Sequence, residues 1–98
     1  MRIVWDPVKS ASNLRKHDVS FEEAAKLLAR ERGFLEFYDD FHSVFEDRFI
    51  AIGWVGRRLV LVVYTEPDDN EWRIISARLA TKAERDLYEA YEKEVHGE

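Results

Sequence analysis

Two apolar segments in the middle of the chain, residues 48–55 and 58–66, restrict the folds that this sequence can adopt. Both are rich in β-branched and aromatic residues, which favours strands. Only Gly56 and Arg57 separate them, and glycine at the first position of a two-residue loop suits a type II′ hairpin turn. In each segment the residues of both parities are apolar. Because such a sheet has two apolar faces, both need to be covered by helices or by a partner.

Three helices are predicted from the residues that begin them. An aspartate ahead of a proline suits an N-cap and the first helical turn, and Ser or Thr followed three residues later by Glu forms a capping box. These signals are Asp6 with Pro7, Ser20 with Glu23, and Thr81 with Glu84. The apolar residues that we expect to face the core are Val8, Ala11 and Leu14 in the first helix, Phe21, Ala24, Ala25 and Leu28 in the second, and Ala83, Leu87, Ala90 and Tyr91 in the third.

The other apolar segments complete a small α+β fold. Residues 2–5 are typical of a short edge strand, residues 71–79 of a further strand, and residues 34–38 of an extra strand or an extended loop. The predicted order is β-α-α-β-β-β-α, and tight turns between consecutive strands favour antiparallel pairing. We therefore expect one domain over residues 1–98, a small curved antiparallel sheet packed with three helices. Three short helices leave part of such a sheet for a partner.

Composition excludes several classes of protein and of site. The chain has no cysteine, which excludes a disulfide scaffold, a thiolate zinc site and a cysteine nucleophile. No histidines lie at metal-ligand spacing and no glycine-rich phosphate loop occurs, so we expect neither a metal nor a cofactor. The N-terminus lacks a signal-peptide pattern and the longest apolar run, residues 59–64, is too short to span a bilayer, so we expect a soluble cytoplasmic protein without membrane contact. Because the net charge is −5, nucleic acid could bind only through a local basic patch.

Arg78 is the first candidate for a functional role. It lies at the end of a predicted core strand, beside the helix that begins near Thr81 and whose N-terminus carries a partial positive charge. Strand alternation places it on the same face as Ile74. An arginine fork next to a helix N-terminus can bind a phosphate. The alternative is that Arg78 forms an ion pair with a carboxylate such as that of Glu84 or Asp6.

Polar side chains of the first predicted helix form a second candidate group. At spacings of i, i+4, i+7 and i+8, one side of the helix carries Lys9, Asn13, Lys16 and His17. The span from the first to the last is about 12 Å at ~1.5 Å per residue, which suits contacts with successive phosphates or with a phosphate and its neighbouring sugar. Histidine is the side chain that ordinarily titrates near neutral pH, so His17 is the natural acid or base. The alternative is a solvated helix face on which His17 caps the C-terminus.

Three further residues are lesser candidates. Arg48 begins a strand and could face the same cleft as Arg78. Arg73 has the opposite parity from Arg78, so the two are not expected to contact one phosphate. Tyr88 flanks the apolar stripe of the last helix and is either a tyrosine at the edge of the core or a catalytic phenol.

Three blocks of this sequence resemble the BrnT-type toxins of bacterial type II toxin–antitoxin systems. The first block is WDPVKSASNLRKHDVSFEEAA at residues 5–25, with Trp-Asp, then Lys, Asn and Lys-His at helical spacing, then Val-Ser-Phe-Glu-Glu-Ala. The second is EDRFIAIG at residues 46–53, and the third is RIISARLATKAERDLYE at residues 73–89. The blocks cover most of the chain and stand in the order expected for the family.

The resemblance implies a fold similar to RelE-type ribonucleases and toxicity through RNA cleavage and inhibition of protein synthesis. It also implies a BrnA-type antitoxin that binds the toxin and through which alone the protein contacts the operon DNA. Metal-independent cleavage needs a base for the 2′-OH, an acid for the leaving 5′-oxygen, and cations for the phosphorane. On this interpretation the catalytic candidates are Arg78, His17, Lys9 and Lys16, the RNA-binding candidates are Asn13, Arg48, Arg73 and Thr81, and Tyr88 is a further catalytic candidate.

A function of another class is also compatible with the sequence, namely a non-catalytic binding module or co-repressor subunit that only docks a DNA-binding partner. The convergence of cationic and titratable residues at one strand end favours the enzyme. The lack of an obvious strong general base counts against it.

Overall fold

The computed structural model describes residues 1–30 and 33–96, and it confirms the predicted α+β class and order of elements. The predicted extra strand near residue 35 is present as β2. In chain order the elements are β1 (Arg2–Val4), α1 (Pro7–His17), α2 (Phe21–Leu28), β2 (Leu35–Tyr38), the 3-10 turn η1 (Asp40–His42), β3 (Arg48–Val55), β4 (Arg58–Asp68), β5 (Glu71–Leu79) and α3 (Lys82–His96). Within the described residues, no helix has the length and apolar character needed to cross a membrane.

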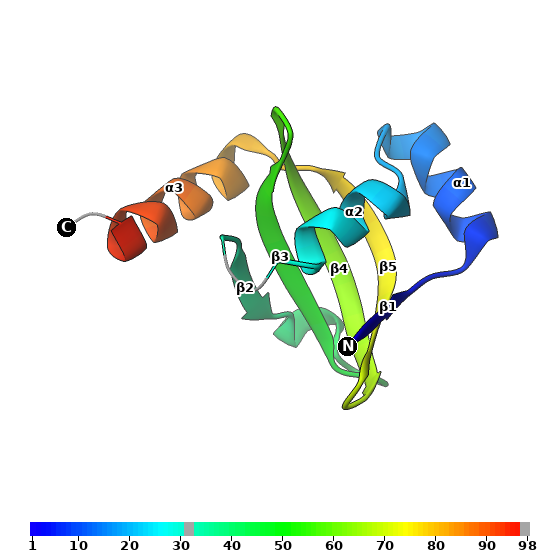
Figure 1. Cartoon of the computed structure of the whole chain (residues 1–98). Helices are drawn as coiled ribbons and strands as arrows, with labels where there is room; N and C mark the ends of the chain where they lie inside the picture. The colour runs from blue at the N-terminus through cyan, green and yellow to red at the C-terminus, as the bar shows by residue number, and fades with distance from the viewer. Residues whose placement is uncertain (31–32, 97–98) are drawn as a thin grey trace.

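The five strands form one twisted sheet in the order β1-β5-β4-β3-β2 (Figure 1). Strands β2 to β5 pair antiparallel with their neighbours, and β1 adds to the edge of β5 in parallel. Val55 pairs with Arg58 across a two-residue turn in which Gly56 has φ +59°. A positive φ at the first turn residue alone is the mark of the predicted type II′ turn, and it explains the glycine.

One face of the sheet is covered by α2, while α1 lies against the edge of the sheet beside β5. Leu27 of α2 is fully buried against strand residues that include Val60 and Val62. The helix approaches β3 so closely that a Cβ atom on Gly53 would lie 2.6 Å from Cδ1 of Leu27. Glycine at this position therefore sets the distance between α2 and the sheet.

Helix α1 packs through polar side chains, which corrects the predicted apolar stripe. Val8 is 77% exposed and Leu14 is 46% exposed. The buried residues of the helix are Ser10, whose hydroxyl accepts a hydrogen bond from the backbone N–H of Phe21, and Asn13. The helix itself is where the sequence predicts it, but its buried side is attached to β5 and α2 by hydrogen bonds and not by apolar contacts.

Among the described residues, the second face of the sheet is covered only at the end where α3 crosses it. Tyr88 is 4% exposed and packs with Ile52 and Leu61, whereas α3 extends beyond the sheet in Figure 1. The predicted stripe was right at Tyr91 and wrong at Leu87, which is 54% exposed, because Tyr88 packs against the sheet beside Tyr91 instead. The rest of this face, which we call the open face, is left for a ligand or partner.

Candidate nucleic-acid interface

A β-bulge in β5 decides which arginines lie on the open face. Tyr64 of β4 pairs with Ile74, but the preceding Val63 pairs with Ser76, so Ile75 is an extra residue. The bulge inverts the alternation of side chains along the strand. Arg73 and Arg78 therefore point to the same face, and Ile74 points to the opposite face, into the core. The predicted opposite parity of the two arginines was wrong, as was the shared face of Ile74 and Arg78, because strand periodicity does not count a bulge.

A third arginine lies in the same row of the sheet. Thr65 pairs with Arg48 on one side and with Arg73 on the other. Two strand spacings place Arg48 and Arg73 about 10 Å apart at their backbones, and five residues along β5 place Arg73 roughly 15 Å from Arg78. Their spacing suits contacts along a polyanion.

The cations of α1 border the open face at the edge of β5. Lys9, Lys16 and His17 are exposed, and with Ser76 they line one surface hollow of about 270 Å³. Lys9 also lines a second hollow, of about 480 Å³, together with Arg73. The structure thus brings Lys9 and Arg73 to one hollow at the edge of β5, whereas Arg48 and Arg78 line neither of the two hollows.

Asn13 joins α1 to β5, and its predicted contact with RNA stays a prediction. Its Nδ2 donates to the carbonyl oxygens of Ala77 at 2.7 Å and Val19 at 2.8 Å, and its Oδ1 accepts from the backbone N–H of Ala77 at 3.3 Å. The residue is 7% exposed and also lines the hollow beside Lys9, Lys16 and His17. The amide therefore takes the place of a neighbouring strand beside the part of β5 that β1 does not reach.

Arg78 is held by Glu84, the ion pair that the sequence left open as an alternative. Nη1 and Nη2 donate to Oε1 and Oε2 at 2.7 Å each, and Nη1 also donates to the carbonyl oxygen of Leu79 at 3.3 Å. A guanidinium has five N–H donors, so the Nε–H and one proton on Nη2 remain on the other edge. The side chain is 39% exposed. Arg78 is thus fixed in orientation while one bidentate edge stays available.

Glu84 also caps the helix that follows. Its Oε1 accepts from the backbone N–H of Thr81 at 2.8 Å, and its own N–H donates to Oγ1 of Thr81 at 3.2 Å, which confirms the predicted capping box. The hydrogen bond from Arg78 lowers the pKa of Glu84 despite its partial burial, and the same bond raises the pKa of Arg78. One carboxylate therefore joins the start of α3 to the candidate phosphate site, whereas the hydroxyl of Thr81 is used in the cap.

Tyr88 is buried where α3 packs on the sheet, one helical turn beyond Glu84. Its hydroxyl donates to Oε2 of Glu92 at 3.3 Å. Burial, followed by the charge of Glu92, raises its pKa. A buried phenol with a raised pKa is a poor base at neutral pH, so the reading as a tyrosine at the edge of the core fits the structure.

Sequence reasoning missed Glu71, a second carboxylate that touches an arginine of the site. Glu71 is 8% exposed and forms ion pairs with Arg2 and, at 3.5 Å, with Arg73. The sequence could have indicated this pair, because Glu71 and Arg73 are two residues apart on a predicted strand and such residues share a face. Within residues 1–30 and 33–96, no group of three or more His, Asp or Glu side chains could hold a metal ion.

Comparison with known proteins bears on the fold and the family of the chain. Residues 5–84 match the family model described as the ribonuclease toxin BrnT of type II toxin–antitoxin systems. The chain belongs to the BrnT family. The crystal structure of the Brucella abortus ribonuclease toxin BrnT superimposes with a TM-score of 0.66 at 26% sequence identity, covering 84% of this chain and 99% of that one. A search of curated proteins finds no match. Membership of this toxin family implies that the protein has an antitoxin partner and an RNA substrate.

Proposed function

We propose that this BrnT-family protein is a metal-independent endoribonuclease that arrests protein synthesis in the cytoplasm and is neutralised by a BrnA-type antitoxin. In this proposal the protein contacts operon DNA only through that antitoxin. The observation that carries the proposal is the clustering of cations around the bulged strand. It gives an otherwise acidic protein one local surface for a polyanion.

We assign separate roles to the strand and helix cations. The free edge of Arg78 binds the scissile phosphate and stabilises the charge of the phosphorane. His17 transfers a proton, because it is exposed beside the two lysines of α1. Lys9 and Lys16 bind the flanking phosphates. Arg48 and Arg73 extend the binding surface across the open face.

The second candidate function is a module that only docks a DNA-binding partner. The Arg78–Glu84 pair favours it, since an arginine that is already paired can be purely structural. The two functions differ in catalysis and can therefore be separated by an RNA assay.

The test is cleavage of RNA by the purified protein in excess EDTA between about pH 5 and 8. We expect the wild type to cleave with EDTA present, at a rate that varies over this range. His17→Gln should lower the rate by about 10² or more and flatten the pH dependence. His42→Gln is the matched control, because His42 is an exposed histidine bound to Asp39 in the connection between β2 and β3.

Two outcomes would contradict the proposal. If the folded wild type leaves RNA intact under all these conditions, the docking function is favoured. If His17→Gln keeps the wild-type rate and pH profile, proton transfer belongs to another group.

A further inference from the structure

The charge of the molecule is divided between two regions. Residues 36–47 and 66–69, which we call the acidic end, contain eight of the 20 Asp and Glu residues and none of the 15 Lys and Arg residues. The rest of the chain, with 12 acidic residues against 15 basic ones, has a net charge of +3. The overall charge of −5 therefore conceals one strongly acidic region and one mildly basic region.

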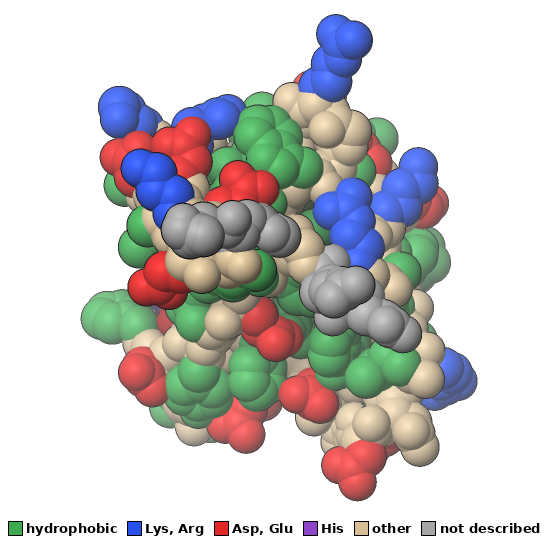
Figure 2. Space-filling model, turned by 60° about the vertical axis from the view of Figure 1, so that its left-hand side comes forward, with side chains coloured by type: hydrophobic (Ala, Val, Ile, Leu, Met, Phe, Trp, Pro, Cys, Tyr) green, Lys and Arg blue, Asp and Glu red, His purple; other side chains and the backbone are tan. Residues whose placement is uncertain are grey.

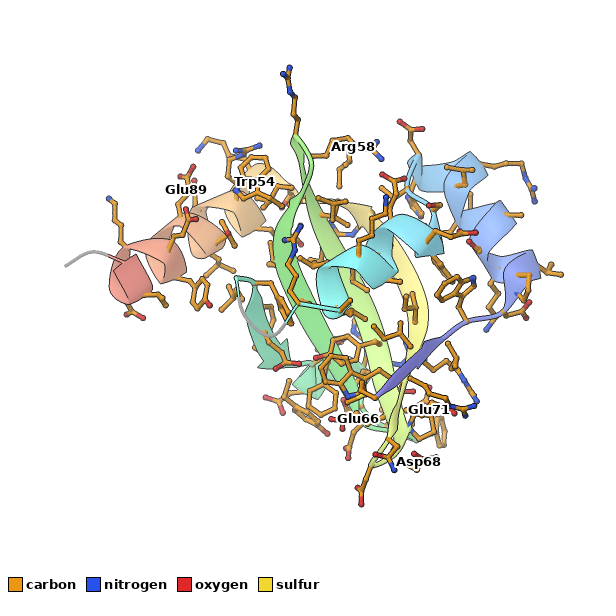
Figure 3. The ribbon with its side chains drawn as sticks, in the orientation of Figure 1. Trp54, Arg58, Glu66, Asp68, Glu71 and Glu89 are labelled. Atoms are coloured by element: carbon orange, nitrogen blue, oxygen red, sulfur yellow. The ribbon has the colours of Figure 1, made fainter. Side chains whose placement is uncertain are left out.

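The two acidic segments lie at the same end of the sheet. One is β2 with its connection to β3, and the other is the hairpin between β4 and β5; the connection and the hairpin both lie towards the bottom of Figure 1. Burial, followed by the charge of Glu66, raises the pKa of Glu36. Figure 3 shows Glu66 and Asp68 at the end of the molecule opposite Arg58. In Figure 2, Asp and Glu are mixed with hydrophobic side chains over the lower half, whereas most Lys and Arg lie in the upper half.

Large apolar side chains project from the acidic end into solvent. Phe45 is 99% exposed, Phe41 is 86% exposed and Val44 is 75% exposed. Single exposed apolar residues are ordinary, but three within five positions of one loop form a patch. Two phenylalanines held in water lose the stabilisation that burial would give them. A partner that buries these two side chains would restore that stabilisation.

The carboxylates of the acidic end are mostly unpaired. Among the described residues, the Glu46–Arg48 contact at 3.6 Å is the one ion pair that this end forms with a lysine or arginine. Asp39 contacts His42 at 2.9 Å, and Asp47 accepts a hydrogen bond from the hydroxyl of Tyr38. The charge of this end is therefore available to cations from outside the chain.

We propose that the acidic end is a docking surface for a cationic, apolar polypeptide segment of the antitoxin, a proposal that rests on the assignment of the protein as a toxin with such a partner. Phe41 and Phe45 are the apolar anchors, and the surrounding carboxylates pair with lysines or arginines of the segment. RNA is repelled by the same charges. A second copy of this chain is also disfavoured, because it would bring eight further carboxylates against the eight already present.

The position of this surface agrees with a role in neutralisation. Arg48 follows the acidic connection directly in sequence and lies on the open face with Arg73. A segment bound at the acidic end therefore lies beside the arginines that we assign to RNA binding. The antitoxin can exclude RNA without binding the cations themselves.

The test compares two double variants in titration calorimetry with the purified cognate antitoxin. Phe41→Ser with Phe45→Ser removes the anchors. Val8→Ser with Leu14→Ser is the control, because it removes exposed apolar side chains from the cationic helix α1. We expect the first variant to bind the antitoxin at least about tenfold more weakly, and the control to stay within about twofold of wild type. Affinity of the wild type should fall as ionic strength rises.

A second probe keeps the proposal testable without the antitoxin. An amphipathic peptide of lysine and leucine should bind the wild type, bind the Phe41→Ser, Phe45→Ser variant at least about tenfold more weakly, and bind in preference to its glutamate and leucine counterpart. Circular dichroism should show that both double variants are folded, and their RNA cleavage should match the wild type.

Several results would overturn the docking surface. One is antitoxin affinity that is unchanged in the anchor variant or lost in the control. Another is a wild type that binds neither the antitoxin nor the lysine peptide. A third is a wild-type dimer that the anchor variant converts to a monomer in sedimentation, since the occupant would then be a second copy. RNA cleavage by the wild type is measured separately, so failure of the docking surface and failure of the ribonuclease assignment can be distinguished.

Discussion

At the scale of single residues, Arg78 differs from the other cations of the site because a second side chain fixes its orientation. Glu84 binds both Nη atoms at 2.7 Å and also caps α3, so one carboxylate serves two structural purposes. Exposed lysines such as Lys9 have no comparable support and adopt many conformations. The guanidinium is therefore the cation of the site that is best prepared to meet a phosphate in a defined geometry.

The pH dependence of folding tests the bond between Arg78 and Glu84. Because that bond lowers the pKa of Glu84 below the value of 4.5 expected when unfolded, the carboxylate stabilises the fold above about pH 4.5 and loses this effect as the pH falls through the lowered value. Glu84→Gln should therefore lower the thermal midpoint near pH 7, and the difference from wild type should shrink towards pH 3. Glu89→Gln, an exposed change on the same helix, is the control. A constant difference across this range would show that the charge of Glu84 does not stabilise the fold.

At the scale of elements, α1 is attached to the sheet by hydrogen bonds. Asn13 bonds to the backbone of Ala77 and Val19, and Ser10 bonds to the backbone of Phe21. These contacts hold the helix at the edge of β5, and with it the exposed residues Lys9, Lys16 and His17. The buried polar side of α1 therefore positions the exposed cationic side.

Replacing Asn13 tests this attachment. Asn13→Ala would leave the N–H and C=O of Ala77 and the C=O of Val19 without their partner, which should cost about 2–4 kcal/mol of unfolding free energy. Urea denaturation measures this loss. Ser12→Ala is the control, because Ser12 is a partly buried neighbour on the same helix. If Asn13→Ala is as stable as wild type but binds RNA poorly, Asn13 is an RNA contact after all.

The outcome for the helices and strands shows what local patterns can predict. The bounds of strand β5 and both capping boxes were predicted correctly, because strand-forming residue types and capping depend on neighbouring residues alone. The prediction for the buried side of α1 was wrong, since that side uses polar contacts, and the prediction for α3 was right at Tyr91 but named Leu87 where Tyr88 makes the contact. The bulge at Ile75 depends on pairing with β4 and leaves no local signal. It decides which arginines share a face, so the site could be predicted as a set of residues but not as a geometry.

At the scale of the whole molecule, opposite charges lie at different places on one small sheet. The acidic end carries exposed phenylalanines, and the cations line α1 and the bulged strand. A protein with a net charge of −5 can therefore attract RNA at one surface while the rest of the molecule repels it. The same division separates the surface proposed for the antitoxin from the surface proposed for RNA.

The central claim is that the free edge of Arg78 stabilises the transition state of RNA cleavage, and the most direct test is the cleavage rate of Arg78→Ala against Arg57→Ala. Arg57 is an exposed arginine at the tip of the turn between β3 and β4, so it controls for the loss of one positive charge. Arg78→Ala should lower the rate by about 10²–10³, or ~2–4 kcal/mol, and Arg78→Lys should restore only part of it, because an ammonium cannot make the bidentate contact. Circular dichroism should show both alanine variants folded, since a partly exposed ion pair contributes only about 1 kcal/mol. A folded Arg78→Ala protein that cleaves RNA as fast as Arg57→Ala would contradict the account.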